Sequence, residues 1–303
     1  MAGHDERKHE MPDGETRDGA APAPAPAPVT GSVPALRDLH ALASAVARSA
    51  GEFLRGRRPV HVEVAATKSS PTDVVTQMDR DVEAFVRSQI SAARPDDGFF
   101  GEEGDEASGT SGLTWVVDPI DGTVNYLYGI EAFAVSVAVV SGGRDPLTWT
   151  VLAGAVHDVA KQETWSAWLG GGAWHEEERV QVNPPRPLAE CLVGTGFGYA
   201  AERRLAQAQV LVHVLPRVRD IRRIGSMALD LCLLAGGHLD LVYERGLQPW
   251  DHAAGGLVVT EAGGTVTGLR RRAADDRMLV AGREPAVAEL VSLLEEVDAD
   301  LGA

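Results

Sequence analysis

Residues 115–126 read WVVDPIDGTVNY, in which an apolar strand runs directly into two aspartates, Asp118 and Asp121, three positions apart. The proline between them fixes its φ angle and lacks an N–H group, while Gly122 permits close approach of the backbone. A turn here can direct both carboxylates to one point. We expect Thr123 to begin a short helix, so that the amides of Gly122 and Thr123 face an anion. The stretch predicts a carboxylate pair beside an anion-binding turn. The alternative is an Asp-Pro turn whose side chains only cap the backbone.

Three other acidic residues stand near expected strand ends or helix starts. Glu102 lies in GEEG after an apolar pair, Asp251 opens the apolar helix of WDHAAGG, and Asp79 follows Thr76. Each also has an ordinary interpretation, as a solvated turn for Glu102 or a helix cap for the two aspartates. Two carboxylates about 4 Å apart repel by about 4 kcal/mol at an effective dielectric constant near 20, so a dry cluster of them requires cations. Oxygen ligands without clustered His or Cys favour Mg²⁺ or Mn²⁺ over zinc.

The composition is that of a folded globular chain, with 303 residues, 44% hydrophobic and 24% charged. A net charge of -16 makes nucleic acid an unfavourable partner. We expect Cys191 and Cys232 to be buried free thiols, which suits a reducing compartment. The charged N-terminus has no apolar signal segment, and the uncharged stretch 132–143 is too short to span a bilayer. These features predict a cytoplasmic protein with no membrane segment.

The patterns divide the chain into three parts. Residues 1–34, with the run APAPAPAP, predict a disordered tail. Residues 35–185 predict an α+β half, with helices from Pro34 to near Gly56 and after Thr76, joined by a turn-like KSSPTDVVT. A mostly antiparallel sheet of strands at 114–117, 133–140, 148–157 and 163–169 would follow.

Residues 186–303 alternate between strand and helix patterns, which predicts an α/β half. We expect strands at 191–194, 219–222 and 239–243, helices at 201–215, 226–235, 250–261 and 285–297, and short strands near Thr265 and Leu279.

Four segments in this order, KSSPTDVVTQMD, GEEG, DPIDGTVNY and PWDHAAG, resemble the inositol monophosphatase family of Mg²⁺-dependent, lithium-sensitive phosphatases. The resemblance runs from about residue 34 to 297. RRIGSMALDLC and YERGLQPWD also resemble the bacterial members that act on inositol 1-phosphate. The resemblance implies an α/β fold of the inositol monophosphatase and fructose-1,6-bisphosphatase type, a layered αβαβα sandwich, and a homodimer.

The same resemblance implies a role for each matching position. Glu102, Asp118 and the carbonyl of Ile120 would hold one Mg²⁺. Asp118, Asp121 and Asp251 would hold a second, and Glu102 and Asp79 would help to place a weaker third. The expected catalytic residues are Glu102, Thr123 and Asp79, with the Thr123 hydroxyl and Glu102 orienting the attacking water.

The resemblance also implies the residues that meet the substrate. The amides of Gly122 and Thr123 would bind the phosphate, and Glu244 would contact a hydroxyl of the polyol. Lys68 matches a lysine near the metals. A surface position for Lys68 and an exposed one for Glu244 remain alternatives. Met227 stands where relatives often have alanine, and its bulk would reshape the polyol pocket.

The implied reaction is hydrolysis of a phosphate monoester by a metal-activated water, with myo-inositol 1-phosphate as the expected substrate. Histidinol phosphate, fructose 1,6-bisphosphate and adenosine 3′,5′-bisphosphate are alternatives, as is a non-catalytic regulatory or scaffolding role. A phosphatase with an aspartyl nucleophile would carry DxDGT, whereas Asp118 and Asp121 are three apart. We expect His252, beside Asp251, to be a packing residue rather than a general base.

Overall fold

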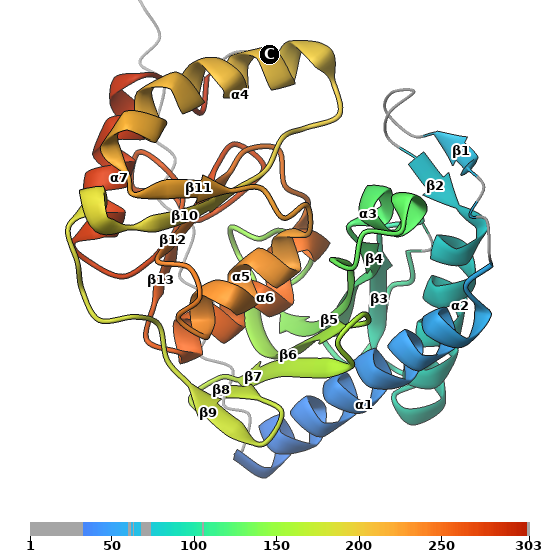
Figure 1. Cartoon of the computed structure of the whole chain (residues 1–303). Coiled ribbons are helices and arrows are strands. Elements are labelled where there is room, and N and C mark those ends of the chain that lie inside the picture. Colours follow the sequence, from blue (N-terminus) through green and yellow to red (C-terminus); the bar gives the residue numbers. More distant parts are fainter. Residues whose placement is uncertain (1–32, 60–61, 63, 68–73, 105, 302–303) are drawn as a thin grey trace, which may run out of the picture.

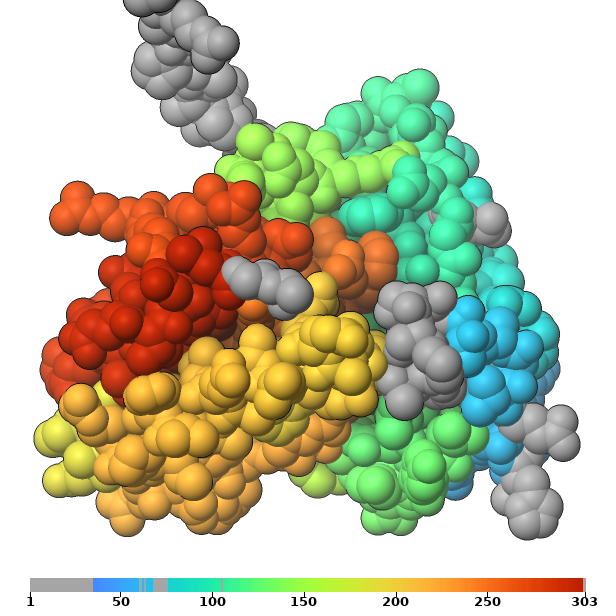
Figure 2. All heavy atoms as spheres, turned by 90° about the horizontal axis from the view of Figure 1, so that it is seen from above, coloured from blue at the N-terminus to red at the C-terminus, as the bar shows by residue number. Residues whose placement is uncertain are grey.

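The computed structural model describes residues 33–59, 62, 64–67, 74–104 and 106–301 (Figure 1). The expected tail lies almost wholly outside the described residues, and Lys68 lies outside them. Seen from above, the N-terminal half (blue to green) and the C-terminal half (yellow to red) lie side by side (Figure 2). None of the described helices is long and apolar enough to cross a membrane.

The N-terminal half is built on a seven-stranded sheet. Its strand order is β3-β4-β5-β6-β7-β8-β9, with β3 and β4 parallel and every other pair antiparallel. This confirms the expected antiparallel character. The strands are β3 (Gly98–Gly101), β4 (Leu113–Asp121), β5 (Ala134–Ser141), β6 (Thr150–Asp158), β7 (Glu163–Trp168), β8 (Gly172–His175) and β9 (Glu178–Val180).

Helices α1 (Val33–Arg57) and α2 (Gln77–Ala93) cover the outer face of this sheet. In α1 the buried Leu39, Ala43, Val46 and Ala50 recur every three or four residues and form one apolar face. Short α3 (Thr123–Tyr128) begins at the predicted residue.

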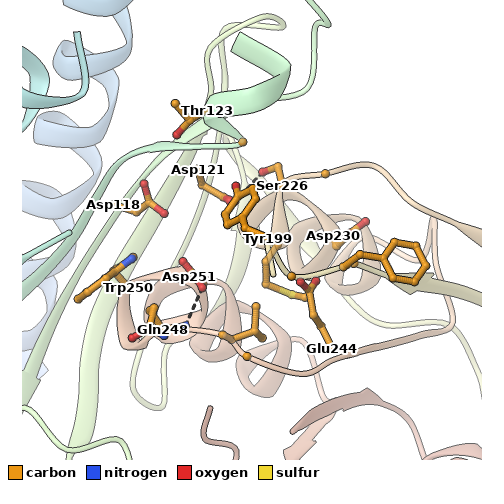
Figure 3. Close-up of a pocket in the computed structure, with 18 of the residues that line it drawn as sticks. Asp118, Asp121, Thr123, Tyr199, Ser226, Asp230, Glu244, Gln248, Trp250 and Asp251 are labelled. Atoms are coloured by element: carbon orange, nitrogen blue, oxygen red, sulfur yellow. Dashed lines mark hydrogen bonds between the residues drawn. The ribbon is translucent and has the colours of Figure 1, made fainter. Parts of the chain in front are cut away.

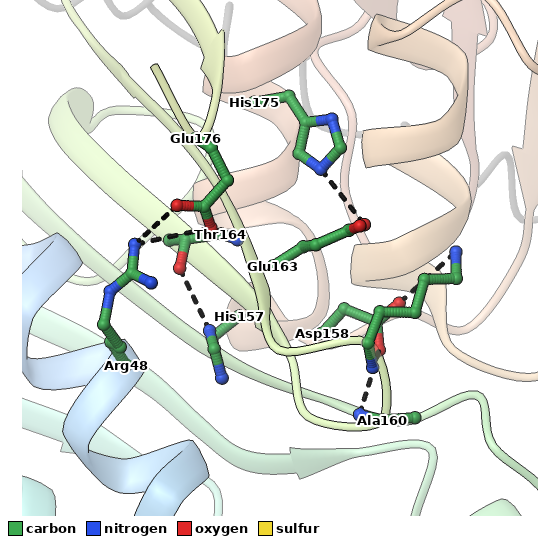
Figure 4. A network of polar contacts seen from close by, with 9 residues as sticks. Arg48, His157, Asp158, Ala160, Glu163, Thr164, His175 and Glu176 are labelled. Carbon is green, nitrogen blue, oxygen red and sulfur yellow. Dashed lines mark hydrogen bonds and ion pairs between the residues drawn. The ribbon is translucent and has the colours of Figure 1, made fainter. Parts of the chain in front are cut away.

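Polar contacts also tie α1 to the sheet (Figure 4). Arg48 of α1 pairs with Glu176 at an N–O distance of 3.0 Å, and the Glu176 carboxylate accepts the backbone N–H of Thr164 at 2.5 Å. His157 of β6 makes a 3.0 Å hydrogen bond with the hydroxyl of Thr164. A Cβ at Gly51 would lie 2.1 Å from the His157 ring, so α1 packs over the sheet at a glycine.

The C-terminal half holds a five-stranded sheet of order β11-β10-β12-β14-β13. β11, β10 and β12 are parallel, and β14 and β13 are antiparallel to their neighbours. α4 and α7 cover its outer face (Figure 1). The elements are β10 (Leu192–Thr195), α4 (Ala201–Val214), β11 (Asp220–Arg222), α5 (Met227–Ala235), β12 (Leu241–Glu244), α6 (Pro249–Glu261), β13 (Thr265–Thr267), β14 (Leu279–Gly282) and α7 (Ala286–Glu296), with 3₁₀ turns at Leu188–Glu190 and Leu215–Arg217.

Helices α5 and α6 fill the space between the two sheets, which completes the expected αβαβα sandwich. The small residues of WDHAAGG allow this close packing. A Cβ at Gly154 of β6 would lie 2.9 Å from the Cα of Ala254, and one at Gly255 would lie 2.9 Å from the Cβ of Leu231 on α5. Helix α6 therefore has sheet on one side and helix on the other, with no spare volume at either contact.

Some sequence expectations were wrong in detail. Residues Val74–Thr76, expected within a turn, form β2, which pairs antiparallel with the unpredicted β1 (Val64–Thr67). Strands β8 and β9 were also not predicted, since they are short and held by pairing rather than by an apolar pattern. The expected thiols Cys191 and Cys232 are buried and free.

The expected turn at Asp118–Asp121 is instead the end of β4. Asp118 pairs with Ser136 and Asp121 with Ala134, so three steps on β4 oppose two on β5. This β-bulge has a clear consequence. In a regular strand, side chains three apart point to opposite faces, and one extra residue restores them to the same side.

Candidate active site

Most of the predicted site residues gather at one cavity between the two halves (Figure 3). Its volume is about 580 Å³, and it lies where β4, β10 and β12 end and α5 and α6 begin. In Figure 3 the carboxylates of Asp118, Asp121 and Asp251 face a common space. The predicted residues that line this cavity are Glu102, Asp118, Ile120, Asp121, Gly122, Thr123, Met227, Glu244 and Asp251.

Asp118 and Asp121 reach the cavity from the bulged end of β4. Asp118 Oδ1 accepts the N–H of Ile120 at 3.0 Å, which fixes the carboxylate against its own backbone. Burial, followed by the negative charge of Glu102, raises the pKa of Asp118 well above its usual value. The Glu102 carboxylate therefore lies close to that of Asp118, where little water screens the two charges.

Asp121 joins the two halves of the molecule. Its Oδ2 accepts the hydroxyl of Ser226 and the N–H of Ala228, both at 2.6 Å, at the start of α5. Burial raises the pKa of Asp121 to about 6 although both hydrogen bonds act to lower it. Asp121 also lines the cavity, so the carboxylate that anchors α5 is part of the site.

Asp251 and Asp79 are both helix caps, and Asp251 is also a cavity residue. Asp251 Oδ2 accepts the N–H of Gln248 at 2.7 Å at the start of α6, and burial raises the pKa of Asp251 well above its usual value. Asp79 Oδ2 accepts the N–H of Thr76 at 2.7 Å. Asp79 Oδ1 lies 3.2 Å from the Thr123 hydroxyl, so Asp79 sits behind Thr123 rather than in the cavity wall.

Gly122 shapes the turn that follows β4. Its φ is 92°, which is a left-handed conformation that L side chains rarely adopt. A Cβ here would lie 2.9 Å from the carbonyl oxygen of Ala132 and 3.1 Å from that of Gly225. Only glycine fits without movement of the backbone, and its tight turn places Thr123 at the first position of α3.

Glu244 and Met227 form part of the wall away from β4. Glu244 ends β12, and its carboxylate lies 2.0 Å from where a Cβ of Gly196 would be, so it fits beneath a glycine. Burial raises the pKa of Glu244 to about 8. Met227 is the first residue of α5 and is 5% exposed. The alternative that Glu244 is a generic surface residue is thus excluded.

The donors fit a hard divalent cation. They are carboxylates and a carbonyl, and burial concentrates negative charge that a cation would neutralise. Across the described ranges, no three Asp, Glu, His or Cys side chains meet closely enough to hold a metal ion as they stand.

Several cavity residues were missed by sequence reasoning. Asp230 of α5 lines the wall, is 1% exposed, and has a pKa raised to about 8 by burial. Its only sequence signal is an acid within an apolar helix. Other missed lining residues are Phe197, Tyr199, Arg203, Arg223, Ser226, Arg245, Gln248 and Trp250.

His252 has the packing role that was predicted for it. It does not line this cavity, and its ring centroid lies 6.1 Å from that of Trp149. Burial lowers the pKa of His252 to about 4, so the ring is neutral near pH 7.

The chain is similar in sequence and in structure to known proteins. The chain is 42% identical over 276 residues to the inositol-1-monophosphatase SuhB of Mycobacterium tuberculosis. The alignment covers 85% of this chain and 93% of that protein. The structure of Mycobacterium tuberculosis SuhB superimposes with a TM-score of 0.73 at 40% identity, covering 88% of this chain and 98% of that one. The Nus factor SuhB of Vibrio cholerae is 33% identical over 228 residues, 75% of this chain and 83% of that protein. A model of the inositol monophosphatase family matches residues 35–299, so this chain belongs to the inositol monophosphatase family.

Proposed function

We propose that the chain hydrolyses myo-inositol 1-phosphate to inositol and phosphate. The observation that carries this proposal is one cavity, where Glu102, Asp118, Asp121 and Asp251 arrive from three separate segments beside the Gly122–Thr123 turn. Relatives that are inositol-1-monophosphatases at 42% identity support the substrate. Phosphatases of this family depend on metal ions, and we propose two or three Mg²⁺, which Mn²⁺ can replace, held by these carboxylates and the Ile120 carbonyl.

The side chains divide the work between the phosphate and the alcohol. When bound, divalent cations lower the pKa of a water and stabilise charge on the leaving oxygen. Glu102 and the Thr123 hydroxyl orient the attacking water, and Asp79 holds that hydroxyl from behind. The amides of Gly122 and Thr123 bind phosphate oxygens. Glu244 accepts a hydroxyl of the polyol, and no covalent intermediate is required.

A substrate panel tests the proposal. Phosphate release is measured with inositol 1-phosphate, histidinol phosphate, fructose 1,6-bisphosphate and adenosine 3′,5′-bisphosphate, each with and without Mg²⁺. We expect release only with Mg²⁺ and the highest kcat/KM for inositol 1-phosphate. A preference for another ester would reject the assignment of inositol 1-phosphate as substrate but not the proposed hydrolysis. No phosphate release from any ester would reject the proposal that the chain is a phosphatase.

The Met227→Ala variant tests what sets alcohol selectivity. Met227 lines the cavity at the start of α5, and its removal leaves room beside the polyol. Since one or two methylene groups in a pocket are worth about 10-fold or more in discrimination, we expect kcat/KM for fructose 1,6-bisphosphate to rise about 10-fold relative to inositol 1-phosphate. Leu229→Ala, in the same helix but outside the cavity wall, is the control. An unchanged ratio of the two kcat/KM values in Met227→Ala would show that Met227 does not set the selectivity for the alcohol.

A regulatory role is the second candidate, favoured by the likeness to the Nus factor SuhB of Vibrio cholerae. The net charge of -16 weighs against direct binding of nucleic acid. The homodimer, the inhibition by lithium and the cytoplasmic location stay predictions from the sequence.

A further inference from the structure

Helix α2 carries a second buried carboxylate that the proposed reaction does not use. Glu83 lies four residues after Asp79, so the two side chains share one face of the helix. Asp79 is 1% exposed and Glu83 is 4% exposed. Burying a carboxylate is costly unless hydrogen bonds compensate it, so the contacts of Glu83 indicate its purpose.

Glu83 contacts the backbone on both sides of Glu102. Its Oε2 accepts the N–H of Glu103 at 2.9 Å. The same oxygen lies 2.2 Å from where a Cβ of Gly101 would be, so β3 can approach the carboxylate only because it ends in glycine. The residue after Glu102 is thus hydrogen-bonded to a buried carboxylate, and the residue before it passes close to the same oxygen.

Asp79 does the equivalent for the other residue that orients the water. Its Oδ1 lies 3.2 Å from the Thr123 hydroxyl, while its Oδ2 is fixed by the Thr76 N–H. The hydroxyl also lies 2.9 Å from the Ile120 carbonyl oxygen. Helix α2 therefore contacts Thr123 through Asp79 and the Glu102 turn through Glu83. The spacing of one helical turn between Asp79 and Glu83 fixes the distance between these two supports.

We propose that Glu83 is a positioning residue, which fixes the Glu102 turn so that the Glu102 carboxylate faces Asp118 and a bound cation. This inference rests on the proposed function. Groups that orient metal ligands from behind typically contribute about 10- to 100-fold to metal affinity or activity. Because Glu83 supports the Glu102 turn and does not line the cavity, we expect its loss to weaken Mg²⁺ binding with little change in KM.

The test compares Glu83→Ala, Glu83→Gln and Gly101→Ala with the wild-type chain. Mg²⁺ affinity is measured by calorimetric titration with MgCl₂ and by the Mg²⁺ concentration for half-maximal activity, and KM for inositol 1-phosphate is measured at saturating Mg²⁺. Asp81→Asn is the matched control, because Asp81 is an exposed carboxylate on the same helix that contacts Gln77.

We expect Glu83→Ala and Gly101→Ala to weaken Mg²⁺ binding about 10-fold or more, with KM within about threefold of the wild-type value. Glu83→Gln keeps a hydrogen-bond acceptor for Glu103 and is expected to recover most of the affinity. Asp81→Asn should match the wild type. If Glu83→Ala does not fold, Gly101→Ala decides by the same criterion.

Two outcomes would overturn the inference, and they are distinguishable. Variants with a lower Tm but wild-type Mg²⁺ affinity would show that Glu83 only holds the fold together. A wild-type chain that binds no Mg²⁺ would instead overturn the proposed function, and this inference with it.

Discussion

The Asp121→Asn variant is expected to hydrolyse inositol 1-phosphate about 10³-fold more slowly than the wild-type chain, with its fold intact. A bound metal ion supplies several kcal/mol of transition-state charge stabilisation, and each 1.36 kcal/mol that is lost slows the reaction about tenfold. The substitution keeps the shape of the side chain. Its amide oxygen can still accept the Ser226 hydroxyl and the Ala228 N–H, which Asp121 Oδ2 now binds at 2.6 Å. The substitution removes only the negative charge that Asp121 contributes to the cavity.

The controls for this variant separate charge from anchoring. Ser226→Ala removes one of the donors to Asp121 but leaves the charge, so a loss of only about 10-fold is expected. Both variants are compared by phosphate release at saturating Mg²⁺ and by thermal unfolding. An Asp121→Asn rate within threefold of wild type would mean that Asp121 is not a metal ligand. A large fall in Tm would instead show that its role is to hold α5.

Addition of Mg²⁺ is expected to raise the Tm, and its removal by a chelator to abolish activity. Asp118, Asp121 and Asp251 are buried carboxylates with raised pKa values, and their repulsion opposes folding until a cation neutralises it. A ligand at 100 times its Kd stabilises the folded state by about 2.7 kcal/mol, and 1 kcal/mol shifts the Tm of a long chain by roughly 2 °C, so we expect a rise of about 5 °C.

Thermal unfolding is followed in MgCl₂ and in NaCl of equal ionic strength, because screening alone also weakens repulsion. The Asp121→Asn variant should respond less to Mg²⁺ than the wild-type chain, since it offers one ligand fewer. An equal rise in both salts would show that the cavity binds no cation. Activity that survives the chelator would contradict metal-dependent hydrolysis.

The sequence predicted the location of the site better than its construction. DPIDGT and WDHAAG are short, unusual patterns, and their acids meet in one cavity as expected. The prediction of a turn at residues 118–121 was wrong. It was made because a proline between two aspartates favours a turn. Pairing with β5 overrides that preference, and the missing N–H of proline falls where the ladder is interrupted.

The residues that support the site could not be found from the sequence. Glu83 occupies a position in an amphipathic helix where an exposed glutamate would look the same, and only the approach of Gly101 shows that it is buried. In the sequence, Asp230 is a single acid in an apolar helix. Only the fold shows that α5 packs beside β10 and β12, which bury its carboxylate. Burial by distant segments decides both cases, and no local pattern encodes it.

The tight contact between Gly154 and Ala254 limits how this protein could acquire a new substrate. Helix α6 cannot shift against β6 without a clash, so the position of Asp251 is fixed. The packing of the interior therefore fixes the end of the site that would bind phosphate. Selectivity can change more easily at wall residues outside α6, such as Met227 and the loop 196–200 that follows β10. Adaptation to other alcohols is therefore expected to alter these few peripheral positions and to leave the interior alone.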